Sequence, residues 1–285
     1  MGAPLVSVIC LCYNHRSYVR EAIESVLQQT YPNVELIVVD DASTDSSVSE
    51  IQMLLNAYPV IRFLSLPQNV GNCKAFNQGW LLSKGEYIID LAADDVLMPT
   101  RIEEGIMAFK GLPDAYGVNF SDAEWIGARG EHLYMHSDRF PHHTIPQGDV
   151  YQSLIDRYFI CSPSMMIKRT VMDDLGGYDE RLTYEDFDFW IRSARNFKFC
   201  YTPKVLVKKR VLDKSLSKKQ FSRGSQQQKS TYQVCEKIFG LNRTKEEFRA
   251  LQRRIRYEIG VSLRFLHVGL MIKYFALWIR TSWRN

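Results

Sequence analysis

Apolar and polar positions along the first hundred residues follow a pattern that predicts alternating strands and helices. The run Leu5–Cys12 is continuously apolar and rich in β-branched residues, as expected of a strand that is buried on both faces. Tyr18–Gln29 then places apolar residues three and four positions apart, which is the period of an amphipathic helix. The further segments that we expect here are strands at Val34–Val39, at Val60–Leu66 and within Gly85–Pro99, and helices at Val48–Tyr58 and Lys74–Ser83.

The order of these segments indicates an α/β fold. Strands that alternate with helices at short spacing favour a mostly parallel sheet with right-handed crossovers. Polar residues follow each predicted strand, and parallel strands bring their carboxyl ends to one edge of the sheet. These residues are Tyr13-Asn14, Asp40-Asp41, Asn69 and Asp94-Asp95. The sequence therefore predicts a ligand-binding crevice at this edge.

Asp94 and Asp95 stand out within Gly85–Pro99, where an apolar strand ends in two adjacent acids. Carboxylate oxygens are hard ligands that suit Mg²⁺ or Mn²⁺, and such an ion commonly carries a phosphate-bearing substrate. The alternative is a polar turn after the strand, because Asp is a common turn residue.

The second half of the chain is less regular. We expect a strand at Tyr116–Ser121, an irregular segment over Asp122–Gly148, a helix at Val150–Phe159 and a short strand at Ser164–Lys168. A long irregular segment inside a compact domain is commonly functional or mobile. A zinc site is conceivable there, but the spacing matches no zinc motif, and we expect loop histidines. The histidines are His132, His136, His142 and His143.

Tyr184–Arg192 predicts another helix, with Glu185 and Asp186 in its first turn. The N-terminus of a helix favours the charged form of an acid. An ionised carboxylate held there can take a proton from a hydroxyl group, which makes these acids candidates for a general base. The alternative is that they only cap the helix.

The C-terminal stretch Asn242–Asn285 has a helical period and a strong excess of basic residues. Ten Lys and Arg against three Glu give it a formal charge of +7, whereas the whole chain carries +4. Arg264, His267 and Lys273 interrupt its apolar run, which argues against a membrane-spanning helix. Two alternatives stay open: a helix that lies on an anionic membrane surface, or one that packs on its own domain with a solvated basic face.

Composition limits the remaining classes. A chain of 285 residues, 46% of them hydrophobic, is long enough for one large domain with a deep core. A net charge of +4 is too small to indicate nucleic-acid binding. Six cysteines without a CxxC spacing favour reduced thiols and an intracellular protein, and the N-terminus lacks the pattern of a signal peptide.

Five segments, taken in order, resemble the family 2 inverting glycosyltransferases, which have the GT-A fold. They lie within roughly the first 215 residues, at Val6–Asn14, Ser25–Asp45, Asn69–Gly79, Gly85–Pro99 and Gly177–Arg192. The resemblance implies a GT-A type α/β fold in which helices flank a nucleotide-binding sheet. It also implies a nucleotide-sugar donor, with a UDP-sugar favoured, and Mg²⁺ or Mn²⁺ as cofactor. The implied reaction is direct displacement with inversion at the anomeric carbon.

The resemblance implies roles for single residues as well. The nucleotide-binding residues would be Tyr13, Asp40, Asp41 and Asp94. Tyr13 would lie against the nucleobase, Asp41 would hydrogen-bond the edge of the base, and Asp94 would face the ribose and diphosphate. Asp95 would bind the metal, and Asp186 would be the general base for the acceptor hydroxyl.

The chain departs from the family pattern at two points. Many relatives carry Asp-x-Asp where this chain has Ala92 in the first position, which predicts a weaker metal affinity. Asp90 is not expected to replace that acid, because four residues along a strand span about 13 Å. Relatives often place a His after the catalytic helix, and the comparable stretch here has none. Basic residues that could contact the diphosphate instead are Lys208, Lys209, Arg210 and Lys214.

These observations predict a catalytic part over residues 1–215, whose 1–112 half binds the nucleotide sugar and whose 113–215 half binds the acceptor, followed by a basic helical extension at 216–285. We expect non-processive transfer, since the Gln-x-x-Arg-Trp motif of processive relatives is absent. The expected acceptor is a saccharide or lipid-linked saccharide of bacterial surface polysaccharide or glycolipid synthesis. The expected location is the cytoplasm or the inner face of the membrane, and the alternative function is a non-catalytic nucleotide-sugar-binding pseudoenzyme.

Overall fold

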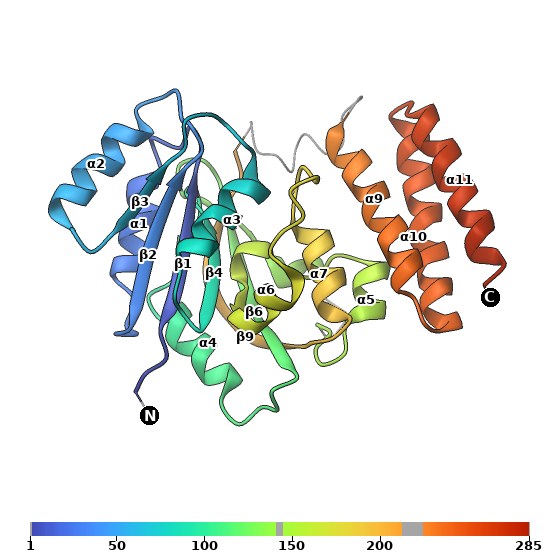
Figure 1. Cartoon of the computed structure of the whole chain (residues 1–285), viewed down its shortest axis with the longest axis horizontal. Coiled ribbons are helices and arrows are strands. Elements are labelled where there is room, and N and C mark those ends of the chain that lie inside the picture. The colour runs from blue at the N-terminus through green and yellow to red at the C-terminus, as the bar shows by residue number, and fades with distance from the viewer. Residues whose placement is uncertain (1, 141–144, 213–224, 285) are drawn as a thin grey trace.

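The computed structural model describes residues 2–140, 145–212 and 225–284 (Figure 1). Its strands are β1 (Val6–Cys12), β2 (Val34–Asp40), β3 (Arg62–Ser65), β4 (Tyr87–Ala92), β5 (Val96–Leu97), β6 (Tyr116–Ile126), β7 (His132–Met135), β8 (Met166–Lys168) and β9 (Lys198–Arg210). Its α-helices are α1 (Val19–Leu27), α2 (Ser47–Ala57), α3 (Asn72–Leu82), α4 (Arg101–Phe109), α5 (Tyr151–Asp156), α6 (Arg169–Leu175), α7 (Asp186–Ala194), α9 (Gln226–Leu241), α10 (Lys245–Arg264) and α11 (Val268–Ser282). Two short 3₁₀ helices are η1 (His136–Arg139) and η2 (Ser162–Ser164).

The sheet follows the strand order β3-β2-β1-β4-β8-β6-β9-β5, and β7 pairs with β6. Strands β1 to β4 are parallel to one another, and β8 runs antiparallel between β4 and β6. Cys12 lies opposite Asp40, and Leu11 lies opposite Ala92, so the polar residues that follow all three strands reach one edge. The strand order reverses at β1, which is where open α/β sheets form a ligand crevice. The predicted α/β fold is confirmed.

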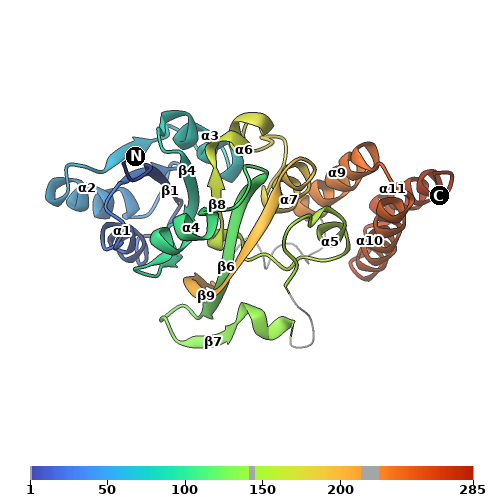
Figure 2. The same cartoon turned by 90° about the horizontal axis from the view of Figure 1, so that it is seen from below.

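Two apolar layers cover the faces of the sheet, because side chains alternate along each buried strand. Ile9 and Leu11 point into the layer that β1 shares with α3, α5, α6 and α7. Val8 and Cys10 point into the opposite layer, which is shared with α1, α2 and α4. Figure 2 shows α3 on one side of β1 and β4 and the helices α1 and α4 on the other.

The C-terminal helices pack on the first of these layers. Ile238 of α9, Leu251 of α10 and Leu277 of α11 are buried in the same core as Phe187 of α7. Figure 1 shows the three helices side by side at one end of the molecule. Part of the apolar surface of this region is therefore core.

The one helical stretch predicted for Asn242–Asn285 is two helices. Helix α10 begins at a capping box, in which the Glu247 N–H donates to the Thr244 hydroxyl at 3.2 Å. It ends before Leu266, whose φ of 57° lies in the left-handed region and breaks the helical hydrogen-bond pattern. Helix α11 then runs back along α10. The hydrophobic period of the sequence continues through this break, and for that reason it did not indicate the turn.

The segment Asp122–Gly148, predicted to be irregular, holds ordered elements. Strand β6 continues to Ile126 and pairs with β7, and the two form a hairpin. The turn contains Gly130, whose φ of 84° is easily reached only by glycine. Gly and His residues in this segment interrupt the alternation of apolar and polar positions from which a strand is predicted, so the sequence did not indicate the hairpin. His142 and His143 lie outside the described residues.

Strand β9 is the largest element that the sequence did not predict. It runs for 13 residues and pairs with β6 along its whole length, which carries the basic residues Lys208–Arg210 to the carboxyl edge of the sheet. Several predicted elements are shorter than expected, among them α1, β3, α5 and β8. The surplus residues lie just outside the ends of these elements, where local periodicity carries little information about boundaries.

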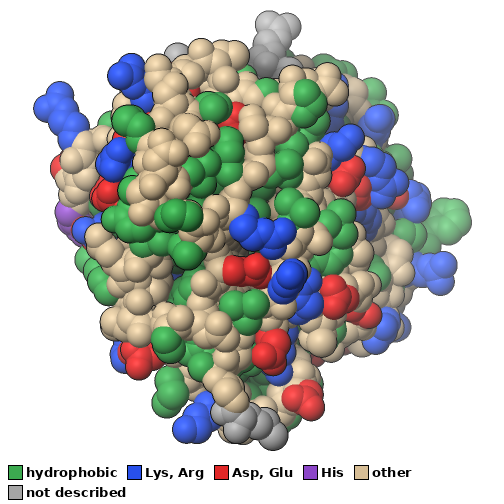
Figure 3. All heavy atoms as spheres, turned by 60° about the vertical axis from the view of Figure 1, so that its left-hand side comes forward, with side chains coloured by type: hydrophobic (Ala, Val, Ile, Leu, Met, Phe, Trp, Pro, Cys, Tyr) green, Lys and Arg blue, Asp and Glu red, His purple; other side chains and the backbone are tan. Residues whose placement is uncertain are grey.

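The surface mixes charges of both signs. Figure 3, which brings forward the side on the left of Figure 1, shows Lys and Arg side chains interspersed with acidic and hydrophobic ones on that face. Within the described ranges, no helix is long and apolar enough to cross a membrane.

The packing of α3 on the sheet gives a first prediction. A methyl group on Gly79 would lie 2.6 Å from Ile9 Cγ2 and 2.9 Å from Val39 Cγ2, closer than carbon atoms can approach. We expect Gly79→Ala to lower the free energy of unfolding in urea by about 1–3 kcal/mol. Gly240→Ala in α9 is the matched control, because its methyl group meets no atom within 4 Å, and it should leave stability unchanged or slightly raised. Equal effects of the two substitutions would contradict this packing.

Candidate active site

The turn after β4 holds Asp94 and Asp95 against the end of β9. The Asp95 N–H donates to the Ala92 carbonyl at 2.9 Å, which closes the turn. The Arg210 N–H donates to Asp95 Oδ1 at 2.8 Å, and the Arg210 Nε–H donates to the Asp94 carbonyl at 2.9 Å. Asp95 is 4% exposed, whereas the Asp94 side chain reaches solvent with 14% of its surface. Strand β9 therefore orients both acids.

Burial and like charge act together on Asp95. Burial, followed by the charge of Asp94, raises the pKa of the Asp95 carboxyl to about 8, and Lys209 and the Arg210 N–H oppose this shift. A further positive charge beside Asp95 would lower this pKa, since an opposite charge favours the ionised form of an acid.

The guanidinium group of Arg210 is occupied by hydrogen bonds within the chain. Its Nη2 donates to Glu21 at 2.5 Å, and its Nη1 donates to the Gly127 carbonyl at 3.3 Å. Lys208 lies 3.9 Å from Glu124. Lys214 lies outside the described residues. Of the described basic candidates for diphosphate contact, Lys209 is the one that faces the predicted site acids.

The ammonium group of Lys209 interacts electrostatically with acids at the end of β4 and at the start of α7. Burial lowers the pKa of its ammonium group, but Cys161, Asp95 and Asp186 together raise it above the usual range. The Nζ atom also lies 5.1 Å from the centre of the Trp125 ring. The structure thus brings the predicted metal ligand, from the end of β4, and the predicted base, from the start of α7, to the same buried cation.

Helix α7 begins at Asp186, with Glu185 at its N-cap. The Ser162 hydroxyl donates to Asp186 Oδ1, and the Asn72 amide donates to Glu185 Oε2. Burial raises the pKa of Glu185 well above its usual range, and the charges of Asp186 and Asp90 add to this effect. The raised pKa of Glu185 favours its protonated form, which sets it apart from Asp186 as a candidate proton acceptor.

Asp188 serves the structure of α7. It is buried, and Arg192 Nε donates to its Oδ2 at 2.6 Å. Lys237 of α9 donates to Asp188 Oδ1 and also to Asp179 at 2.6 Å. Two cations already hold Asp188, so this acid is a poor candidate for a base.

Helix α9 also braces the segment that leads into α7. The Thr183 N–H donates to the Ser230 hydroxyl at 3.0 Å. The hydroxyl groups of Tyr184 and Thr231 share a hydrogen bond of 2.7 Å. Both contacts lie immediately before Glu185, and they restrain the backbone that carries the acid pair. No local pattern indicated this brace, because the partners in each contact are 47 residues apart along the chain.

Asp90 lies on the face of β4 that points toward α7. The Tyr178 hydroxyl donates to Asp90 Oδ2 at 3.1 Å. Burial raises the pKa of Asp90 to about 7, the Tyr178 hydrogen bond opposes the shift, and the charge of Asp186 adds to it. Asp90 is thus part of the acid cluster, on the side of the base.

The predicted nucleotide-binding residues lie at the ends of β1 and β2. Tyr13 is 45% exposed, as an aromatic ring must be to receive a ligand. The Asp41 carboxylate accepts the N–H groups of Val70 and Gly71 at 2.7 and 2.9 Å, so it holds the loop that begins α3. Asp40 is fully buried, and its Oδ1 atom has no hydrogen-bond partner among the described residues.

His15 is a site residue that the sequence reasoning missed. Its Nε2 lies 4.0 Å from Asp94 Oδ2, across the gap between the ends of β1 and β4. Its Nδ1 is buried and has no partner in the described part of the chain. The available signal was its position directly after Tyr13-Asn14 at the end of a buried strand.

The histidines of the β6–β7 region do not support a zinc site. His132 Nδ1 lies 2.8 Å from Glu124 Oε1, and His136 Nδ1 accepts the Trp125 indole N–H at 3.3 Å. Over residues 2–140, 145–212 and 225–284, no group of three or more His, Cys, Asp or Glu is arranged to hold a metal ion.

Asp94 and Asp95 fit a different mode of metal binding. Magnesium is commonly held by one or two carboxylates together with substrate phosphates and water, rather than by a complete set of protein ligands. The adjacent acids supply hard oxygens, and the raised pKa of Asp95 reports negative charge that lacks full compensation. The residues present therefore fit Mg²⁺ or Mn²⁺ that arrives with a diphosphate.

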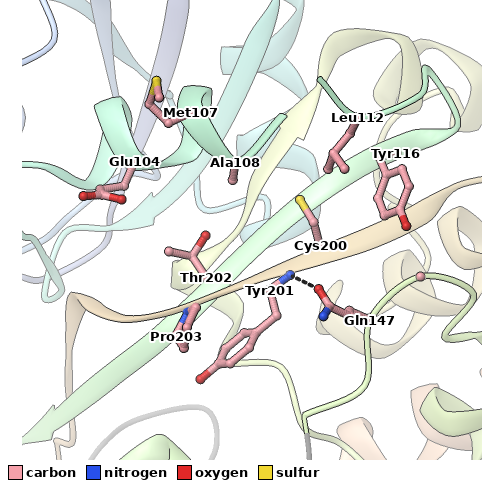
Figure 4. A pocket seen from close by; sticks show the side chains of 11 residues that line it. Glu104, Met107, Ala108, Leu112, Tyr116, Gln147, Cys200, Tyr201, Thr202 and Pro203 are labelled. Carbon is pink, nitrogen blue, oxygen red and sulfur yellow. Dashed lines mark hydrogen bonds between the residues drawn. The ribbon is translucent and has the colours of Figure 1, made fainter. Parts of the chain in front are cut away.

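A separate hollow lies between α4, the start of β6 and β9. Its volume is about 580 Å³, and Met107, Tyr116 and Tyr201 are among the residues that line it. In Figure 4 the Gln147 side chain accepts the Tyr201 N–H, at 3.4 Å. None of the predicted site residues lines this hollow, so we do not assign it to the site.

Asp90→Asn should flatten the pH dependence of stability. The pKa of Asp90 is about 7 in the folded protein and near 4 in an unfolded chain, so between these values only the folded state keeps the proton. Stability is therefore lost as the pH rises from about 4 through 7. Asparagine has no such proton and still accepts from Tyr178. We expect the stability of the variant relative to wild type to increase by on the order of 4 kcal/mol between pH 4 and 8, measured in urea.

Asp114→Asn is the control, because Asp114 is fully exposed, and its stability should follow the wild type across the same range. A constant difference between Asp90→Asn and wild type at all these pH values would contradict the raised pKa of Asp90.

Comparison with known proteins gives the family. The family model described as glycosyl transferase family 2 matches residues 7–176. A glycosyltransferase of Rickettsia felis is 32% identical over 220 residues, which cover 76% of this chain and 36% of that protein. This chain spans between about a third and two thirds of the length of three Rickettsia relatives.

Solved structures share the fold at low identity. TarS 1-349 of S. aureus, in complex with UDP-GlcNAc, gives a TM-score of 0.71 at 17% identity and covers 97% of this chain and 79% of its own. Mannosyltransferase PcManGT of Pyrobaculum calidifontis, in complex with GDP-Man and Mn²⁺, gives 0.66 at 14% identity and covers 100% and 89%. With its GT-A type fold and a family match over residues 7–176, the chain belongs to glycosyl transferase family 2.

Proposed function

We propose that this chain transfers a sugar from a nucleotide-diphosphate sugar to an acceptor hydroxyl, with metal assistance and with inversion at the anomeric carbon. The observation that carries the proposal is that Asp94, Asp95 and Asp186 all lie near enough to Lys209 to raise the pKa of its ammonium group. One electrostatic site then holds acids for the donor side and a base for the acceptor side. Two structures with this fold support the donor class, since TarS 1-349 is in complex with UDP-GlcNAc and PcManGT is in complex with GDP-Man and Mn²⁺.

The donor would bind across the ends of β1, β2 and β4. Tyr13 would stack on the nucleobase, and Asp41, with Asp40 beside it, would accept hydrogen bonds from the edge of the base. Asp94 would face the ribose and the diphosphate. We favour a UDP-sugar. Asp41 already orders the loop at Gly71, so donor binding and loop position would be coupled through one carboxylate.

Asp95, with Asp94 beside it, would hold Mg²⁺ or Mn²⁺, which when bound offsets the charge that develops on the departing diphosphate. Lys209 adds a fixed positive charge at the same place, and burial strengthens its interaction with an anion. Lys209 would therefore supply part of the charge compensation that a metal ion, held more weakly without the acid that Ala92 replaces, would otherwise supply.

Asp186 would accept the proton of the acceptor hydroxyl. The hydroxyl oxygen attacks the anomeric carbon from the face opposite the diphosphate, and the new bond forms as the carbon–oxygen bond to the diphosphate breaks. The electron pair of that bond leaves with the nucleoside diphosphate, and the proton passes to Asp186. Ser162 holds the carboxylate in place from one side. The raised pKa of Glu185 favours its protonated form, so Glu185 would be the less suitable proton acceptor.

We propose a saccharide or lipid-linked saccharide acceptor of bacterial surface polysaccharide or glycolipid synthesis, one sugar per encounter, and a cytoplasmic location at the inner face of a membrane. Residues 1–112 would bind the donor, residues 113–215 the acceptor, and residues 216–285 would brace α7. A non-catalytic nucleotide-sugar binder is the second candidate, and the presence of Ala92 in the first acid position favours it. Donor hydrolysis with and without Mn²⁺ separates the two.

Asp95→Ala should remove metal-dependent donor binding. Its carboxylate is the buried acid of the pair, and its loss leaves Asp94 alone to meet the ion. We expect UDP affinity in the presence of Mn²⁺ to fall at least about tenfold, measured by calorimetry. Asp114→Ala, at an exposed acid, is the control and should bind as wild type does. Unchanged Mn²⁺-dependent binding in Asp95→Ala would sink the metal assignment.

Asp186→Asn should separate binding from chemistry. The amide keeps the size of the side chain but cannot take a proton, so we expect UDP affinity within about twofold of wild type and turnover reduced by about 10²–10⁴-fold. Sugar release from UDP-sugars, with water as acceptor, is the measurement. Asp173→Asn, at an exposed acid of α6, is the control. Wild-type turnover in Asp186→Asn would place the base elsewhere.

A further inference from the structure

Helix α11 has two apolar faces. Tyr274, Leu277 and Thr281 are fully buried against α9 and α10. A second set of apolar side chains is exposed, and Trp283 at the helix end has 87% of its surface open. This outer stripe consists of Val268, Ile272, Phe275, Ile279 and Trp283. The spacing of four, three, four and four residues places them on one side of the helix.

The outer stripe differs from ordinary scattered surface hydrophobics. Single exposed apolar residues are common on soluble proteins, whereas a continuous row marks a contact surface. Leu263 and Leu266, just before α11, are also exposed. The buried face holds α11 in place, so the stripe is presented on a packed helix.

The charges beside the stripe all have one sign. From residue 259 to residue 284 the chain has no Asp or Glu, and its charged residues are Arg264, Lys273, Arg280 and Arg284. Arg280 pairs with Glu236 of α9 at 3.0 Å. The nearest acid in the sequence, Glu258, is buried and paired with Arg254 at 2.8 Å. Arg264 and Lys273 have no carboxylate within ion-pair distance among the described residues.

We infer that the outer face of α11 is a membrane-contact surface for an anionic lipid bilayer. The stripe would enter the interface between headgroups and acyl chains, and the cations beside it would meet the lipid phosphates. Complementary charge selects this occupant, because an anionic surface suits a face whose unpaired charges are all positive. The inference deepens the proposed function by naming the surface that would bring the site to a lipid-linked acceptor, and it rests on that function only in this respect.

Both parts of the surface are needed. Lys and Arg side chains near an anionic leaflet attract it and lose this attraction when salt screens them. The apolar stripe adds burial that depends little on salt. Binding should therefore fall with rising salt, and it should fall further when the stripe is removed.

The test is flotation of the 285-residue chain with vesicles, without donor. One set contains phosphatidylcholine alone, and the other contains about 30% phosphatidylglycerol, each at about 20 and 500 mM NaCl. The test variant carries Phe275→Gln, Ile279→Gln and Trp283→Gln. The matched control carries Met53→Gln, Val60→Gln and Leu81→Gln, three exposed apolar residues far along the chain from α11.

We expect wild type and control to bind anionic vesicles at low salt at least about tenfold better than neutral ones, and the stripe variant to lose at least about tenfold of that binding. Equal binding of wild type to both vesicle types would overturn the inference, and so would an equal loss in variant and control. A wild-type dimer in sedimentation that the stripe variant converts to a monomer would assign the stripe to a second copy instead. UDP binding, measured in the same preparations, reports separately on the proposed function and should be unchanged in both triple variants.

Discussion

The confinement of several carboxyl groups around one buried ammonium group is the constraint on which the site depends. Asp94, Asp95 and Asp186 all act on the pKa of Lys209. Charges of one sign repel each other strongly in a low dielectric. A cation, backbone N–H donors and protons retained on some of the acids offset this repulsion. Strand β9 supplies the first two, because it carries Lys209 and also the Arg210 N–H that Asp95 accepts. Its pairing along β6 is therefore part of the chemistry of the site.

The same constraint divides the acids by role. Burial raises the pKa of Asp95 to about 8 and that of Asp90 to about 7, and it raises that of Glu185 well above the usual range. Acids in such a cluster cannot all ionise at once. A positive charge placed beside Asp95 would lower its pKa and favour its ionised form. Asp186 accepts a hydrogen bond from the Ser162 hydroxyl, and its charge acts on the ammonium group of Lys209.

The sequence analysis predicted those strands and site residues whose signal lies within a short stretch of the chain. The buried strands β1, β2 and β4 are continuous apolar runs, and the acids that follow them mark one sheet edge, so Asp40, Asp94 and their neighbours were found. Strand β9 was not found, because cations and Pro203 conceal its alternation and its partner β6 lies some eighty residues away. The brace from Thr231 to Tyr184 and the contact of His15 with Asp94 depend on tertiary packing, which no local period encodes. The roles of the site residues stay predictions.

The C-terminal helices connect the chemistry of the site with the outer surface of the molecule. Helix α9 contacts α7 through Lys237 and Asp188, and it packs against α11. Helix α11 buries Leu277 on the side of α9 and exposes Phe275 on the opposite side. A helix needs only one apolar face to pack on its own domain, so internal stability accounts for the first face and leaves the second without a role. Since an exposed apolar row lowers solubility, its presence beside cations is best explained by a contact that the isolated chain does not make.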